Sequence, residues 1–234
     1  MTVRYVNNGY GTALELSYNH GADQIVVHDF QLQGTADLVV AVRFADGSTW
    51  NNAELDRRSM LGDDGFNDIQ GSERDDVLDG QGGDDNLKGN GGNDTLLGGD
   101  GNDFLDGGMG SDTIVGGKGG DFISAHDQGS DTYVFNAGDG YDVIGYAPWG
   151  LTGGDTIRFG EGIAKTDLHL WVNGNTLNIH YGSGDIRVDN FLQQDGQTSL
   201  INTFAFADGT SYTYRELSNH APLPGAPVPE HGGQ

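Results

Sequence analysis

A nine-residue repeat in the middle of the chain limits its possible folds more than any other feature. From Gly80 the sequence reads GQGGDDNLK, GNGGNDTLL, GGDGNDFLD, GGMGSDTIV and GGKGGDFIS without interruption. Two weaker copies precede these, GDDGFNDIQ from Gly62 and GSERDDVLD from Gly71. A fixed short period is the signature of a solenoid, in which each unit packs only against its neighbours.

Each unit combines a tight turn with a short extended segment. Glycines at positions one, two and four allow backbone angles that a Cβ would forbid, so the first six residues can form a turn whose carbonyl groups point at one centre. The last three residues are extended, with one apolar side chain directed inward. Two units then form one coil, and we predict an all-β fold: a parallel β-roll, which is a β-helix solenoid of nonapeptide repeats, capped by strand-rich flanking segments. The inward side chains are Ile69, Leu78, Leu87, Leu96, Leu105, Ile114 and Ile123.

Position six of the repeat carries an acidic side chain. Stacked coils bring these like-charged carboxylates close together, which costs energy unless a cation lies between them. The formal charge of the whole chain, −24 from 35 acidic and 11 basic residues, favours cations as partners and disfavours nucleic acid and anionic membranes. The position-six residues are Asp76, Asp85, Asp94, Asp103, Asp112 and Asp121.

Calcium is the cation that best suits such turns. The chain has no cysteine, so disulfides and thiolate metal sites are excluded and a hard cation on oxygen ligands remains. Ca²⁺ takes about six to eight oxygen ligands at roughly 2.3 to 2.6 Å, which a carboxylate from each of two stacked turns and glycine-loop carbonyls can supply. Mg²⁺ requires a stricter octahedron, so a loose cage rich in carbonyl oxygens favours Ca²⁺.

The repeats resemble the RTX, or haemolysin-type calcium-binding, family, whose motif is GGxGxDxUx with U a large apolar residue. The resemblance covers roughly Gly62 to Asp142. It implies a parallel β-roll that is disordered without calcium inside a bacterium and folds after export by a type I secretion machine.

The resemblance also implies which residues bind calcium. Carried over position by position, the ligands are the six aspartates above and turn carbonyls, and we expect about four or five ions. Asn67 and Arg74 depart from the motif in the first two units, and Asp131 joins the last site only if one residue bulges, because it follows Asp121 by ten positions instead of nine. The turn carbonyls include those of Gly83, Gly92, Gly101, Gly110 and Gly119.

The two flanks of the repeats are copies of one unit. IVVHDF from Ile25 matches IRVDNF from Ile186, and VRFADGSTWNNAEL from Val42 matches FAFADGTSYTYREL from Phe204. The unit resembles the haemolysin-type calcium-binding-related segments found between RTX blocks of large secreted bacterial proteins. We therefore divide the chain into a β-strand flank (1–61), the nonapeptide roll (62–130), a second β-strand flank (131–220) and a Pro/Gly-rich linker (221–234).

We expect the flanks to cover the open ends of the solenoid, where backbone groups are unpaired. Their aromatic residues alternate along predicted strands and are expected to pack in the core and cap, although a sugar-binding surface is the alternative. These residues are Phe30, Phe44, Trp50, Phe191, Phe206 and Tyr212.

Motifs for catalysis are absent from the sequence. There is no HExxH for a zinc protease and no GxSxG for a serine hydrolase, so we predict that the segment is not an enzyme. His28 and His180 are expected to be ordinary strand residues. No run of about 18 apolar residues predicts a membrane span, and the first residues lack the pattern of an N-terminal secretion signal.

The predicted function is that of a calcium-binding structural module. It folds on extracellular Ca²⁺, rigidifies a larger secreted adhesin, toxin or exoenzyme, and assists its export by type I secretion. Its predicted partners are calcium ions and neighbouring domains of the parent protein. The alternative is a calcium-dependent module that binds an extracellular polysaccharide or a cell-surface partner.

Overall fold

The computed structural model describes residues 2–7, 12–18, 23–27, 41–43, 49–51, 60–125, 129–146, 154–191 and 201–218. In the N-terminal flank, β1 (Thr2–Asn7), β2 (Thr12–Tyr18) and β3 (Asp23–Val27) form an antiparallel sheet. β4 (Ala41–Arg43) pairs antiparallel with β5 (Thr49–Asn51).

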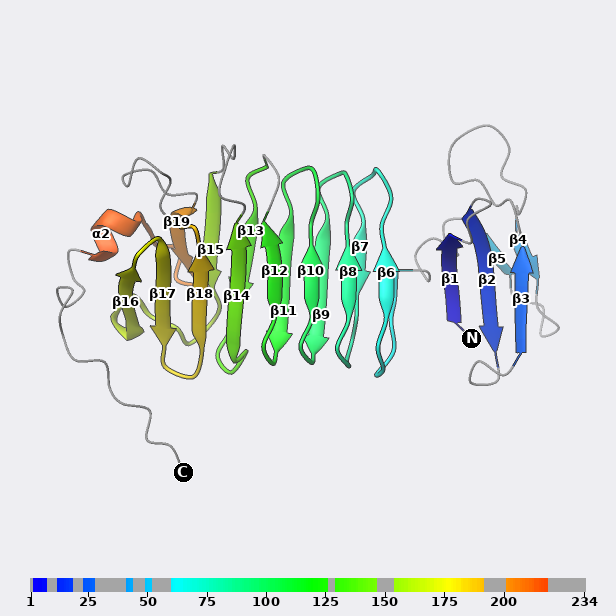
Figure 1. Ribbon diagram of the computed structural model, residues 1–234, viewed down its shortest axis with the longest axis horizontal. Coiled ribbons are helices and arrows are strands. Elements are labelled where there is room, and N and C mark those ends of the chain that lie inside the picture. The colour runs from blue at the N-terminus through cyan, green and yellow to red at the C-terminus, as the bar shows by residue number, and fades with distance from the viewer. Residues whose placement is uncertain are drawn as a thin grey trace, which may run out of the picture.

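Two sheets of mainly parallel strands build the rest of the described chain (Figure 1). Successive repeats alternate between the sheets, so that every coil contributes one strand to each. The eight-stranded sheet has the order β16 (Leu168–Asn173), β17 (Thr176–Tyr181), β18 (Asp185–Asp189), β14 (Tyr141–Tyr146), β12 (Phe122–Ala125), β10 (Phe104–Asp106), β8 (Asn86–Lys88), β6 (Asp68–Gln70). The seven-stranded sheet has the order β20 (Ser211–Tyr212), β19 (Ile201–Phe206), β15 (Asp155–Phe159), β13 (Thr132–Phe135), β11 (Thr113–Lys118), β9 (Thr95–Asp100), β7 (Val77–Asp79).

The register of these strands explains the apolar column between the sheets. Leu105 pairs with Leu87 on one side and with Ile123 on the other, so residues two repeats apart lie directly side by side. Leu96 and Ile114 are aligned in the same way in the second sheet. All the predicted inward residues are buried, with exposed fractions of 0% for Leu87 and Leu105. The predicted parallel β-roll is therefore confirmed.

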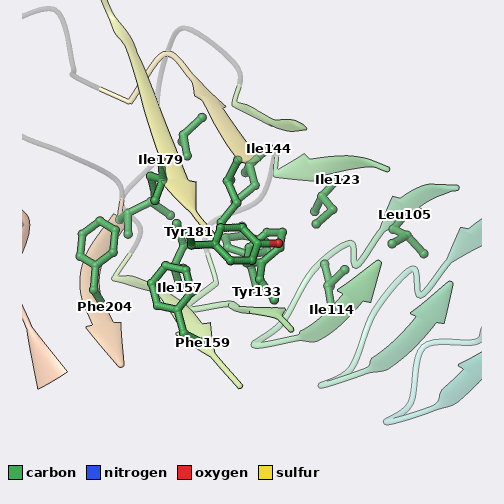
Figure 2. Packing of buried hydrophobic residues seen from close by; sticks show 14 of the residues in the cluster. Leu105, Ile114, Ile123, Tyr133, Ile144, Ile157, Phe159, Ile179, Tyr181 and Phe204 are labelled. Atoms are coloured by element: carbon green, nitrogen blue, oxygen red, sulfur yellow. The ribbon is translucent and has the colours of Figure 1, made fainter. Parts of the chain in front are cut away.

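The coils lengthen toward the C-terminal end, and the core changes from aliphatic to aromatic. Ile123 pairs with Ile144, and Ile144 pairs with Val188 across a much longer connection. That connection holds a short 3-10 helix, η1 (Lys165–Asp167), and the β16–β17 hairpin, which extends the eight-stranded sheet in antiparallel fashion. A short helix, α2 (Tyr214–Ser218), follows β20. Figure 2 shows the aromatic cluster beside the aliphatic column; its labelled rings are Tyr133, Phe159, Tyr181 and Phe204.

Residues on the C-terminal side of the predicted boundary at 131 continue the same two sheets, because β13, β14 and β15 pair in parallel with the repeats before them. The division of the chain into four segments stays a prediction. Phe191 and Phe206 are buried, and Tyr212 packs against the core, as expected for core packing. Phe30, Phe44 and the side chain of Trp50 lie outside the described residues. Within the described ranges, no helix is long and apolar enough to span a bilayer.

Candidate metal centre

The turns between strands share one backbone conformation from the third repeat onward. Residues at positions two and four of these turns have positive φ angles, which glycine adopts without steric cost. Position two is Gln81, Asn90, Gly99, Gly108 and Gly117, and position four is Gly83, Gly92, Gly101, Gly110 and Gly119. The same pair of angles recurs at Gly138 and Gly140, beyond the last regular repeat.

Close approach between coils makes glycine necessary at positions one and four. A Cβ on Gly101, whose φ is +149°, would lie 2.1 Å from the carbonyl oxygen of Gly83 in the preceding coil. A Cβ on Gly98 would lie 2.3 Å from Asp103 Oδ2 and 2.4 Å from the carbonyl oxygen of Gly116. Because position one has no side chain, two oxygen atoms face the same point beside it: a carboxylate oxygen of the same turn and a carbonyl oxygen of the next coil. We call this arrangement a cradle.

Gly101→Ala is expected to destabilise the roll by about 2 kcal/mol or more, because it adds a steric collision to an unfavourable φ. Gly138→Ala is the matched control: its φ is +96°, but no described atom lies within 4 Å of the added Cβ. We expect the control to cost only about 1 kcal/mol. Urea unfolding in saturating calcium measures both values, and equal losses for the two variants would contradict the collision with Gly83.

The position-six carboxylates form two continuous hydrogen-bonded ladders. In each ladder, Oδ1 of one residue accepts a hydrogen bond from the backbone N–H of the residue one coil earlier; Asp103 Oδ1 lies 2.8 Å from the nitrogen of Asp85, and Asp121 Oδ1 lies 2.9 Å from that of Asp103. The first ladder is Asn67, Asp85, Asp103, Asp121 and Asp142. The second ladder is Asp76, Asp94, Asp112, Asp131 and Asp155.

Two aspartates of the ladders were not among the predicted site residues. Asp142 and Asp155 follow their ladder neighbours by 21 and 24 residues, so the nine-residue period misses them. The segments AGDGYDVIG from Ala137 and GLTGGDTIR from Gly150 are degenerate copies of the repeat and would have identified both. The ladders end there, because the next coil places Ile186 beside Asp142 and Ile201 beside Asp155.

The second carboxylate oxygens in the middle of the ladders are buried among other oxygens. Asp85, Asp103 and Asp121 have side chains that are only 2–3% exposed. Burying a charged oxygen without a donor is expensive, so each such oxygen requires a proton or a cation. Among the described residues, no group donates a hydrogen bond to Oδ2 of Asp85, Asp94, Asp103, Asp121 or Asp142.

Burial also raises the proton affinity of these groups. The pKa of Asp85, Asp94 and Asp121 is raised to about 6, mainly by desolvation and in addition by repulsion from neighbouring carboxylates of the ladders. The pKa of Asp142 rises to about 7 for the same reasons. Without a cation, the ladders therefore hold protons at pH values where free aspartate is ionised.

The ends of the second ladder differ from its centre, because protein donors reach the carboxylates there. The backbone N–H and hydroxyl of Ser72 donate to Asp76 Oδ2 at 2.6 and 2.8 Å. At the other end, the Tyr133 hydroxyl lies 3.4 Å from Asp131 Oδ2 and 3.3 Å from Asp155 Oδ2. The predicted ligands Asp76 and Asp131 thus lie in the ladders, but with hydrogen-bond donors beside them.

The oxygen atoms in the central turns fit calcium. In the part of the chain that the structure describes, no three His, Cys, Asp or Glu side chains converge on one point. A metal held between two stacked turns must therefore rely on backbone carbonyls in addition to carboxylates, which is the ligand set that Ca²⁺ accepts and Zn²⁺ does not. His180 Nδ1 lies 2.8 Å from Asp185 Oδ1 on a half-exposed surface, apart from the ladders.

The sequence of the turns matches a known family. Residues 61–96 and 88–123 fit the model of the RTX calcium-binding nonapeptide repeat, in four copies. Residues 61–123 are an RTX repeat block. The predicted family resemblance of the repeats is thereby confirmed, and RTX nonapeptide repeats bind Ca²⁺. The RTX match does not single out individual ligands, which stay predictions, as does the resemblance of the two flanks to calcium-binding-related segments.

Two solved structures are similar to this chain over part of their length. The extracellular lipase LipA from Serratia marcescens is 17% identical over 84% of this chain and 30% of the lipase, with a TM-score of 0.29. The AlgE6R3 subunit of the Azotobacter vinelandii mannuronan C5-epimerase is 18% identical over 74% of this chain and 94% of that subunit, with a TM-score of 0.28. This chain thus spans less than a third of the length of the lipase. A search of curated proteins found no match.

Proposed function

We propose that this chain is a structural module whose RTX block folds when extracellular calcium binds between its stacked turns. The observation that carries the proposal is the row of buried Oδ2 atoms, including those of Asp85, Asp103 and Asp121, for which the described residues supply no donor. The Oδ2 atoms of Asp85 and Asp103 each lie in a cradle beside a carbonyl oxygen of the next coil, at Gly80 and at Gly98. Bound Ca²⁺ would supply the positive charge that these oxygens require.

The proposed ligands are the central members of the two ladders together with the position-four carbonyls. Each carboxylate accepts a backbone hydrogen bond with one oxygen and directs the other into the space between coils. The fold therefore fixes the orientation of the carboxylate and the position of its charge. About four or five ions would neutralise roughly eight to ten carboxylate charges, a large share of the net charge of the chain. The proposed carboxylate ligands are Asp85, Asp94, Asp103, Asp112 and Asp121, with carbonyls of Gly83, Gly92, Gly101, Gly110 and Gly119.

Because its folding depends on calcium, the module is expected to fold outside the cell and not in the cytosol. Millimolar calcium outside the cell suits several weak cages, whereas the low calcium of the cytosol leaves the carboxylates repelling one another and the chain extended. We therefore propose that the module is secreted by a type I machine, and that it becomes a rigid spacer beside neighbouring domains of a larger adhesin, toxin or exoenzyme. In this proposal the module itself performs no catalysis.

A comparison of calcium with magnesium tests the proposal. We expect millimolar Ca²⁺ to raise the folded fraction of the chain from near zero to near one, because several ions bind only to the folded chain. The same concentration of Mg²⁺ is expected to have little effect, since its octahedral geometry does not suit a carbonyl-rich cage. An equal rise with both ions would count against the calcium sites and would indicate general screening of charge instead.

A second candidate function, binding of polysaccharide, is favoured by exposed aromatic side chains on the eight-stranded sheet. Phe104 of β10 and Phe122 of β12 stack with ring centroids 5.6 Å apart and an angle of 9° between their planes. They remain 38% and 40% exposed, and Tyr141 of β14 and Trp171 of β16 are exposed on the same sheet. A glycan array in calcium tests this candidate: hits that disappear in Phe104→Ala and Phe122→Ala would support it, and an empty array would exclude it.

A further inference from the structure

The first two turns of the RTX block differ in backbone conformation from the turns of the five repeats that follow. In the third to seventh repeats, positions two and four both have positive φ angles, from Gln81 and Gly83 to Gly117 and Gly119. Among the described residues with positive φ, none belongs to the turns 62–67 and 71–76. The carbonyl groups of the first two turns are therefore not arranged like those of the later ones.

The oxygen atoms that these two turns present are already hydrogen-bonded to protein. In the turn 62–67, the side-chain oxygen of Asn67 accepts a hydrogen bond from the backbone N–H of Asp63 at 2.7 Å. In the turn 71–76, Asp76 Oδ2 accepts two hydrogen bonds from Ser72. In the later turns the corresponding oxygens, such as Oδ2 of Asp85 and Asp94, receive no hydrogen bond from any described residue.

Side-chain amides from the next coil form hydrogen bonds with the first two turns. The Gln81 amide donates to the carbonyl oxygen of Gly62, and the Asn90 amide donates to that of Gly71 at 2.7 Å. Both residues stand at position two with φ angles of +69° and +74°, where the following repeats have glycine. Positive φ is uncommon for residues other than glycine, and the hydrogen bond across the coils offsets its cost.

We infer that Gln81 and Asn90 close the first inter-turn gap of each ladder with a hydrogen bond, and that the calcium column begins one coil later. The closed gaps are those between turns 62–67 and 80–85 and between turns 71–76 and 89–94. In the next gaps, position two is Gly99 or Gly108, which has no side chain to donate, and Oδ2 of Asp85 or Asp94 receives no hydrogen bond from the described residues. The N-terminal coil is thus attached to the roll by protein hydrogen bonds and needs no ion. This inference rests on the proposed function.

Native mass spectrometry of the full chain in calcium tests where the column begins, with two isosteric variants of one ladder. Asp94→Asn is expected to lower the number of bound ions by one, because it removes a charge from a gap that needs a cation. Asp76→Asn is expected to leave the number unchanged, since an amide oxygen can still accept the hydrogen bonds of Ser72. Loss of an ion from Asp76→Asn would overturn the inference and leave the proposed function intact. Absence of bound calcium in the unsubstituted chain would overturn the proposed function itself.

Hydrogen exchange of the calcium-loaded chain tests the amides independently. The double variant Gln81→Gly, Asn90→Gly is expected to speed exchange in residues 60–79 by about ten-fold or more, because it removes both cross-coil hydrogen bonds. Exchange in residues 98–125 is expected to stay unchanged and serves as the internal control. Unaltered exchange in residues 60–79 would show that the amides do not hold the first coil.

Discussion

Asp103→Ala is expected to raise the calcium concentration at half-folding by about ten-fold or more, a loss of at least about 1.4 kcal/mol. The carboxylate is 2% exposed and lies in the middle of the first ladder. Its removal takes away the proposed ligand Oδ2 and also leaves the buried N–H of Asp85 without the acceptor that Oδ1 provides. Far-UV circular dichroism during a calcium titration measures the change.

Asp76→Ala is the control for position in the ladder. Asp76 is half-buried at the N-terminal end, and Ser72 already donates to its Oδ2. We expect a shift of about three-fold or less, because the substitution removes hydrogen bonds but no calcium ligand. Equal midpoints for Asp103→Ala and Asp76→Ala would contradict the assignment of the central carboxylates to the ions.

The metal-free roll is expected to be more stable at about pH 5 than at about pH 7.5. Burial raises the pKa of Asp85, Asp94 and Asp121 from 3.8 to about 6, and that of Asp142 to about 7. The folded state therefore binds protons more tightly than the unfolded chain. The stability that these groups contribute is complete below pH 3.8 and is lost as the pH rises through 6 to 7. Far-UV circular dichroism of the chain in calcium-free buffers across this range measures the folded fraction.

Neutral isosteres separate this effect from the general reduction of charge. Asp142→Asn imitates the protonated ladder residue, so it is expected to stabilise the metal-free chain at about pH 7.5 and to weaken the pH dependence. Asp84→Asn makes the same charge change at an exposed residue, whose pKa is lowered by hydrogen bonds from the backbone and side chain of Asn102. We expect no stabilisation from it. Metal-free stability that increases with pH would show that the buried carboxylates are not the dominant groups.

The regular part of the roll could be predicted from the sequence, because each repeat has the same residue types at the same positions. Glycine at a positive φ, an aspartate after the turn and one apolar residue in the strand fix a coil without any long-range information. For this reason Leu87, Leu96 and Leu105 are buried as predicted. The positions of the aspartates in two ladders follow from the same register.

The ends of the ladders could not be predicted from a period of nine residues. Asp142 and Asp155 join them through coils of irregular length, and only the pairing of β12 with β14 and of β13 with β15 brings them into register. Tyr133 stands at an inward position where an aliphatic residue is usual, and its hydroxyl lies between two carboxylates that are far apart in sequence. The contacts of Gln81 and Asn90 likewise join residues one coil apart, so they are visible only once the stacking is known.

The aromatic core at the C-terminal end has a similar origin. Tyr181 belongs to the antiparallel β16–β17 hairpin and reaches this core from there. The centroid of its ring lies 5.7 Å from that of Phe159 in β15. Alternation along the strands predicts that such rings are buried, but not that they continue the aliphatic column of the repeats. The sheets run on beyond residue 131 because β13 to β15 keep the parallel pairing after the nonapeptide pattern has become irregular.

Far-UV circular dichroism of the chelated chain, titrated with Ca²⁺ and separately with Mg²⁺, tests the central claim most directly. If calcium between the turns holds the roll together, the β signal will increase cooperatively with Ca²⁺ and not with Mg²⁺. A chain that already has its full β signal in chelator, and does not respond to calcium, would show that the aspartate ladders are stable without metal, and the claim would be wrong.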